Sequence, residues 1–204
     1  IGKSHLAAAL AERIPGEPHT RLRYQCSPYH TNSALRPFIA QLERAAGFKP
    51  DDTSEQRLDK LEALLGMGAS RLQAVAPLFA ALLSLPFGER YPPLALIPTQ
   101  QRRRTLAALL DQFEGLARQQ PILLVFEDAQ WADADSLLLL QELLVRAAPA
   151  PLLMVLSHRP KTSETTALER VLRRVEENPV LQVARLELEP LDASATAQLA
   201  HAYL

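Results

Sequence analysis

The chain has 204 residues, of which 48% are hydrophobic, so it can bury one sizeable core but is short for two. Its net charge of -1 gives no overall basic surface, which argues against nucleic acid or an anionic membrane as a partner of this chain. The single cysteine, Cys26, excludes an internal disulfide and suits a cytoplasmic location, and no apolar run approaches the roughly 20 residues that span a bilayer.

The chain opens on a phosphate-binding pattern. Residues 2–4, Gly-Lys-Ser, match the end of G-x-x-x-x-G-K-[ST], although such a triplet also occurs by chance. The first glycine of that pattern would lie before residue 1, so we expect a fragment cut inside its own nucleotide site. Leu6, Leu10 and Ile14 recur at fourfold spacing and predict a helix over residues 4–14. Its free N–H groups would point at an anion held by the turn.

A short strand and a helical insertion are predicted next. Weak alternation indicates the strand over residues 21–26. Apolar periodicity then predicts helices from Ser33 to Gly47, from a cap at Asp52 or Thr53 to Gly66, and from Arg71 to Leu83, before an irregular connection over 84–99. Together these helices predict an insertion spanning about residues 33–98.

The next stretch predicts the central strand of the fold. A periodic helix over residues 100–118 leads into residues 122–128, Ile-Leu-Leu-Val-Phe-Glu-Asp. A continuous apolar run fits a strand covered on both faces in a parallel sheet. Glu127 and Asp128 would then lie at the edge where such folds bind ligands, one serving Mg²⁺ and the other the attacking water. The alternative is a solvated acidic turn.

Two further strand and helix pairs follow. Asp133 or Asp135 can cap a helix over 136–148, which precedes an apolar strand over 152–157. Arg159, just after that strand, could sense a terminal phosphate, or it could be an ordinary surface arginine. The remaining pattern predicts a helix over 166–177, a strand over 180–188 and a helix from residue 190 to the end.

These segments together resemble the signal-transduction P-loop ATPases of the AAA superfamily, in the branch similar to origin-recognition-complex modules. The matching segments are Gly2-Lys3-Ser4 (Walker A), residues 122–133 (Walker B and its tail), Ser157-His158-Arg159-Pro160 (sensor 1) and Leu188-Glu189-Pro190-Leu191 (entry to the lid). Residues 26–33 also resemble bacterial proteins that join this ATPase to a class III adenylate cyclase domain and tetratricopeptide repeats.

The resemblance implies roles for the matching residues. Gly2 belongs to the phosphate loop, Lys3 would hold the β- and γ-phosphates of ATP, and Ser4 would bind Mg²⁺. Glu127 and Asp128 would share the metal and catalytic-acid positions, and which acid takes which is open because relatives more often have aspartate first. Arg159 would bind nucleotide as sensor 1.

The resemblance also implies an α/β P-loop NTPase fold, with a parallel sheet flanked by helices and its first strand missing. Residues 1–190 would form the core and 191–204 the start of a helical lid. We expect ATP binding and slow hydrolysis to act as a regulatory switch on other domains of a longer chain, such as a cyclase, repeats or a DNA-binding region, with a homo-oligomer left open. The alternative is a nucleotide-binding scaffold without hydrolysis, and this fragment alone is expected to be inactive.

Overall fold

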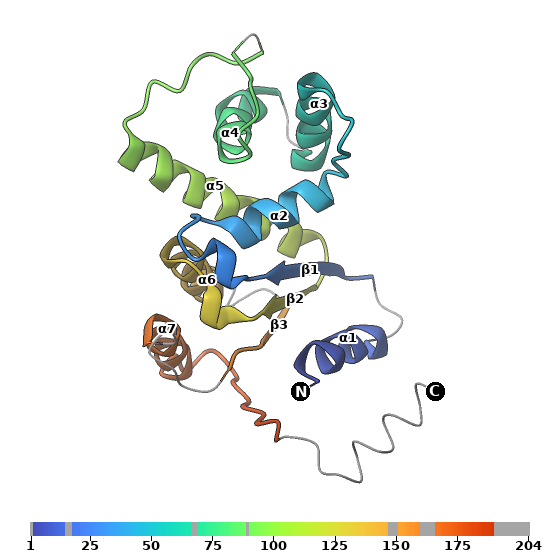
Figure 1. Cartoon of the computed structure of the whole chain (residues 1–204), viewed down its shortest axis with the longest axis vertical. Helices are drawn as coiled ribbons and strands as arrows, with labels where there is room; N and C mark the ends of the chain where they lie inside the picture. The colour runs from blue at the N-terminus through green and yellow to red at the C-terminus, as the bar shows by residue number, and fades with distance from the viewer. Residues whose placement is uncertain are drawn as a thin grey trace.

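The computed structural model of the chain describes residues 2–14, 18–66, 69–88, 90–146, 151–159 and 166–189. Figure 1 shows the arrangement of its helices and strands. In chain order they are α1 (Lys3–Arg13), β1 (Thr20–Gln25), the short 3-10 helix η1 (Pro28–His30), α2 (Arg36–Ala45), α3 (Ser54–Leu65), α4 (Ala69–Leu82), α5 (Pro98–Gln119), β2 (Ile122–Glu127), the short 3-10 helix η2 (Ala129–Trp131), α6 (Ala134–Arg146), β3 (Leu152–Leu156) and α7 (Thr166–Glu176).

The three strands form a parallel sheet in the order β1-β2-β3. Thr20 pairs with Ile122 at the start of β1 and β2, and Ile122 pairs with Leu152 of β3 on the other side. Every residue of β2 is buried, as its continuous apolar run predicts for a central strand. Helices cover both faces of the sheet, so the predicted α/β fold with a parallel sheet is confirmed (Figure 1).

Alternate residues of β2 belong to different cores. Ile122, Leu124 and Phe126 belong to the main core, together with buried residues of α2, α5 and α6. Leu123 and Val125 point to the opposite face and pack against Ala7 of α1. This division follows from the twofold repeat of a strand, in which successive side chains point to opposite faces.

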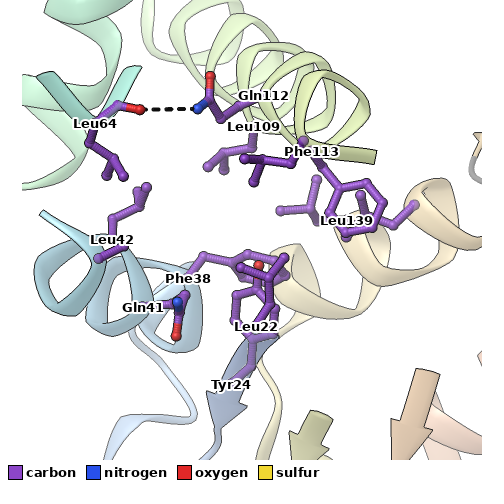
Figure 2. Close-up of a pocket in the computed structure, with 13 residues that line it drawn as sticks. Leu22, Tyr24, Phe38, Gln41, Leu42, Leu64, Leu109, Gln112, Phe113 and Leu139 are labelled. Atoms are coloured by element: carbon purple, nitrogen blue, oxygen red, sulfur yellow. Dashed lines mark hydrogen bonds between the residues drawn. The ribbon is translucent and has the colours of Figure 1, made fainter. Parts of the chain in front are cut away.

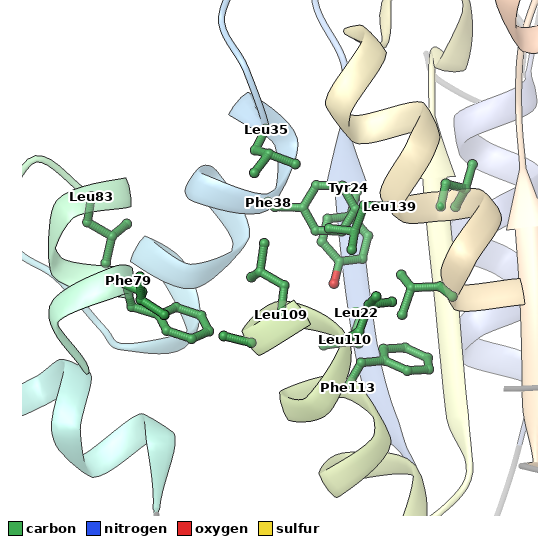
Figure 3. Close-up of a cluster of buried hydrophobic side chains, with 14 of the residues drawn as sticks. Leu22, Tyr24, Leu35, Phe38, Phe79, Leu83, Leu109, Leu110, Phe113 and Leu139 are labelled. Carbon is green, nitrogen blue, oxygen red and sulfur yellow. The ribbon is translucent and has the colours of Figure 1, made fainter. Parts of the chain in front are cut away.

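The helical insertion shares the main core with the sheet. Leu58 and Leu61 of α3 and Phe79 of α4 are buried in the same cluster as Leu22 of β1. Figure 3 shows Phe79 of α4 on the α5 side of the cluster, toward Leu109, while Phe38 of α2 lies against Tyr24 of β1. The rings of Tyr24 and Phe38 are 4.5 Å apart between centroids, close enough for a favourable tilted contact.

Two helix starts are explained by local chemistry. α3 has a capping box, in which the Gln56 amide N–H donates to Thr53 Oγ1 over 3.2 Å and the Thr53 amide donates to Gln56 Oε1 over 2.9 Å, so Thr53 and not Asp52 is the cap. α2 begins at Arg36, three residues later than Ser33, because Leu35 has a positive φ of 58° that is incompatible with a helix.

α1 is confirmed as a helix, but of the three apolar residues that predicted it only Ile14, just after its end, packs against the sheet. Leu6 and Leu10 are 47% and 38% exposed, whereas Ala7 is only 5% exposed and contacts the sheet. A small alanine lets the helix axis approach the strands closely, which brings Ala7 into contact with the sheet.

The strand predicted over residues 180–188 is wrong. Residues 182–189 have no regular structure, and Val180 and Leu186 are 65% and 80% exposed. An alternating apolar pattern becomes a strand only when a neighbouring strand takes its hydrogen bonds, and in the described part of the chain none pairs with this segment. The helix predicted from residue 190 onward, and with it the lid over 191–204, lies outside the described residues.

Candidate functional site

The first turn of α1 lies on the side of the sheet where the strands end. α1 runs opposite to the strands, so Lys3 and Ser4 lie toward their carboxyl ends (Figure 1). Gly2 precedes the helix with a φ of 96°, a left-handed conformation that residues with a Cβ rarely adopt. Its carbonyl accepts the Leu6 amide over 2.8 Å, which leaves the earlier amides of the turn available to an anion.

Glu127 ends β2 as a buried carboxylate with a cationic partner. Only 1% of the residue is exposed, and its Oε2 is 2.5 Å from Nε of Arg23 on β1. The Arg23 side chain is 60% exposed, so the pair joins a buried anion to a cation in contact with solvent. A buried carboxylate needs such a partner because desolvation of an isolated charge is costly. Arg23 is a site residue that the sequence patterns did not reveal.

Asp128 forms the tight turn that follows β2. Its φ and ψ are 54° and 41°, and its side chain is half-buried. The Asp128 amide donates to Ser157 Oγ over 3.3 Å, and its Oδ1 accepts from Nε2 of Gln130 over 3.3 Å. Ser157 therefore holds the backbone of Asp128, and Gln130 contacts its carboxylate.

The loop after β3 adjoins this turn. Ser157 donates its amide to Phe126 O and accepts the Ala129 amide at its carbonyl, both over 2.9 Å. The Arg159 amide donates to Gln130 Oε1 over 3.1 Å, and the Arg159 side chain is exposed. The ends of β2 and β3 thus meet at one edge of the sheet, as parallel strands require.

Asp133 caps α6 and also contacts α2. Its Oδ1 accepts amides of Leu35 and Asp135 over 3.1 Å and of Ser136 over 3.0 Å, and its Oδ2 accepts the Ser136 hydroxyl over 2.6 Å. Of the two predicted caps, the structure selects Asp133. Asp135 instead pairs with Arg102 at the start of α5.

Cys26 follows β1 as a small buried residue. Its side chain points into the main core, and burial raises the pKa of its thiol to about 12, with Asp133 and Asp128 adding to the effect. A thiol that stays protonated is a poor nucleophile, which favours a packing role.

A cavity beside the sheet is too small for a nucleotide. Figure 2 shows it between β1, α2, α5 and α6, lined mostly by leucine and aromatic side chains. Its volume is about 80 Å³, below the roughly 300 Å³ at which ligand pockets begin. One polar group on its wall, Gln112, already donates to Leu64 O over 3.5 Å.

The predicted residues thus form two groups. Glu127, Asp128 and Arg159 lie together at the ends of β2 and β3, and Gly2, Lys3 and Ser4 begin α1 on the same side of the sheet (Figure 1). Among the described residues, no three His, Cys, Asp or Glu side chains converge as a metal cage. One hydroxyl and one or two carboxylates fit Mg²⁺, which keeps several waters and takes its other ligands from phosphates.

A sequence profile described as AAA ATPase domain matches residues 1–155. The chain belongs to this AAA ATPase family. An AAA ATPase domain implies nucleotide binding and hydrolysis, typically with Mg²⁺. The domain is also 29% identical over 196 residues to the uncharacterized protein R02095 of Rhizobium meliloti (strain 1021). That match covers 96% of this chain and 18% of the relative. No solved structure is significantly similar, and no described helix is long and apolar enough to cross a bilayer.

Proposed function

We propose that this AAA ATPase domain binds ATP and hydrolyses it slowly with Mg²⁺, and that the nucleotide state acts as a regulatory switch on other parts of a longer chain. The observation that carries the proposal is the pair of acids that ends the central strand, with one acid buried and the other held beside the Arg159 loop. The match of the chain to only 18% of a relative's length supports a role as one module of a larger protein.

Each residue has a proposed role. Lys3 would contact the β- and γ-phosphates, and the N–H groups that open α1 would bind their oxygens. Ser4 and Glu127 would hold Mg²⁺, whose charge offsets the charge that develops on the phosphate oxygens. Asp128 would orient the attacking water, and Arg159 would contact the γ-phosphate.

A nucleotide-binding scaffold without hydrolysis is the second candidate. The Arg23 contact favours it, because a guanidinium 2.5 Å from Glu127 already satisfies the buried carboxylate. In that case bound nucleotide would stabilise the fold by mass action without being consumed.

Nucleotide affinity and phosphate release in the full natural chain separate these functions. For a switch, we expect Lys3→Ala to abolish ATP binding and Asp128→Asn to keep binding while turnover is lost. Tight binding with no phosphate release in the unaltered protein would support the scaffold. No binding of ATP or ADP would refute both.

A further inference from the structure

Gln130 is a buried side-chain amide that connects two loops. The residue is 6% exposed and lies in η2, directly after the acids. Its Nε2 contacts Asp128 Oδ1 over 3.3 Å, and its Oε1 accepts the Arg159 amide over 3.1 Å. We propose that Gln130 is a positioning residue that fixes the Asp128 carboxylate and the Arg159 backbone relative to each other. This inference rests on the proposed hydrolysis of ATP.

The chemistry of the two partners determines the orientation of the amide. A backbone N–H can only donate, so Arg159 must meet the amide oxygen, and an ionised carboxylate can only accept, so Asp128 must meet the amide nitrogen. Glutamine supplies both groups. Ionised glutamate would supply only the acceptor, and methionine, of similar length, would supply neither.

The Asp128 contact leaves one carboxylate oxygen available. Among the described residues, Gln130 makes the only hydrogen bond to this carboxylate, and that bond goes to Oδ1. Since no described residue bonds to Oδ2, this oxygen can accept a proton or a water hydrogen bond at the edge of the sheet. Fixing one oxygen limits the side-chain rotation that would otherwise misplace the other, which is how outer partners support a reacting group.

The Arg159 contact extends the link between the strands beyond their regular pairing. Backbone hydrogen bonds join the two segments as far as Ser157, whose carbonyl accepts the Ala129 amide. Two residues after Ser157, the Arg159 amide donates to the Gln130 side chain instead of to a backbone carbonyl. The exposed Arg159 side chain can then reach a ligand from a fixed backbone. The Asp128 carboxylate and the Arg159 backbone are therefore both bonded to one side chain, that of Gln130.

The test compares Gln130→Met and Gln130→Glu in the full natural chain, with Gln112→Met as the matched control at a partly buried glutamine far from the acids. Hydrogen exchange at single amides, ADP affinity and steady-state ATP hydrolysis are measured. In Gln130→Met, the Arg159 amide should exchange about two- to tenfold faster, while the Ser157 and Ala129 amides stay unchanged. In Gln130→Glu, the Arg159 amide should stay protected.

Both Gln130 variants should lower kcat about 10- to 100-fold, as loss of an outer partner commonly does, with ADP affinity unchanged. Gln112→Met should match the unaltered protein in every measurement. Unchanged Arg159 exchange in Gln130→Met would overturn the link, and a normal kcat in Gln130→Glu would overturn the Asp128 contact. If Gln130→Met does not fold, the kcat of Gln130→Glu still tests whether the contact with Asp128 supports hydrolysis. An unaltered protein that binds ADP without hydrolysing ATP would refute the proposed function, and the catalytic part of this inference with it.

Discussion

Replacement of Asp133 by alanine should be among the most destabilising single changes near the strand ends. The carboxylate is 7% exposed and accepts three backbone amides and one hydroxyl. Two of those amides belong to the first turn of α6, and the third belongs to Leu35 at the start of α2. One side chain therefore caps a helix and attaches a second helix to it.

The expected cost follows from these bonds. Loss of a helix cap costs about 0.5–2 kcal/mol, and leaving the buried Leu35 amide without a partner costs about 1–3 kcal/mol more. Asp133→Ala should thus lower the free energy of unfolding by about 1.5–5 kcal/mol, a large share of the roughly 5–15 kcal/mol of a typical domain. Asp133→Asn keeps an oxygen for the three amides and should cost less than about 1.5 kcal/mol.

Urea unfolding followed by circular dichroism measures this difference. With a slope of about 2 kcal/mol per molar urea, the midpoint for Asp133→Ala should fall by about 0.8–2.5 M at an unchanged slope. The control is Asp111→Ala, since Asp111 is 49% exposed and makes only a 3.5 Å ion pair with Arg71, worth about 0–1 kcal/mol. Equal midpoints for the two alanine variants would refute the reasoning.

Three further predictions concern packing and ionisation. Phe79→Ala should lower the free energy of unfolding in urea by about 3–5 kcal/mol because Phe79 is fully buried. Leu138→Ala, at a residue that is 37% exposed, should lower it by less than about 1 kcal/mol. Equal losses for the two variants would contradict the assignment of Phe79 to the core. Hydrogen bonds from Lys60 and the Lys49 amide lower the pKa of Asp52, so this carboxylate adds stability above its ordinary pKa and loses it as the pH falls through the folded value. Lys60→Met should raise the Asp52 pKa in an NMR titration, and an unchanged value would point to another cause. Cys26 should resist a thiol reagent at pH 8 until urea unfolds the protein, since burial raises its pKa; rapid labelling of the folded chain would show that it is accessible.

The sheet was predictable because its central strand has an unusual composition. Five apolar residues without polar alternation indicate burial on both faces, and the two acids mark where the strand ends. The α5 helix was predictable for a similar reason, since apolar residues recur at helical spacing from Leu106 to Leu116. These signals lie in neighbouring residues of the sequence, so they can be recognised without knowledge of the tertiary structure.

The contacts that organise the site were not predictable, because they join residues that are far apart in the chain. Arg23 and Glu127 are separated by 104 residues, and Gln130 and Arg159 by 29. α1 shows the same limit on a smaller scale. Its leucines mark a helix, but whether leucine or alanine meets the sheet depends on how closely the two elements approach.

The left-handed turn at Asp128 determines which substitutions give interpretable results there. Aspartate and asparagine adopt a φ of 54° more readily than other residues with a side chain, partly because their short polar groups bond locally. Alanine has no such bond and would cost about 1 kcal/mol or more in this conformation. An alanine scan would therefore combine the loss of a carboxylate with a rearranged backbone. Asp128→Asn removes only the charge and keeps a residue that suits this backbone conformation.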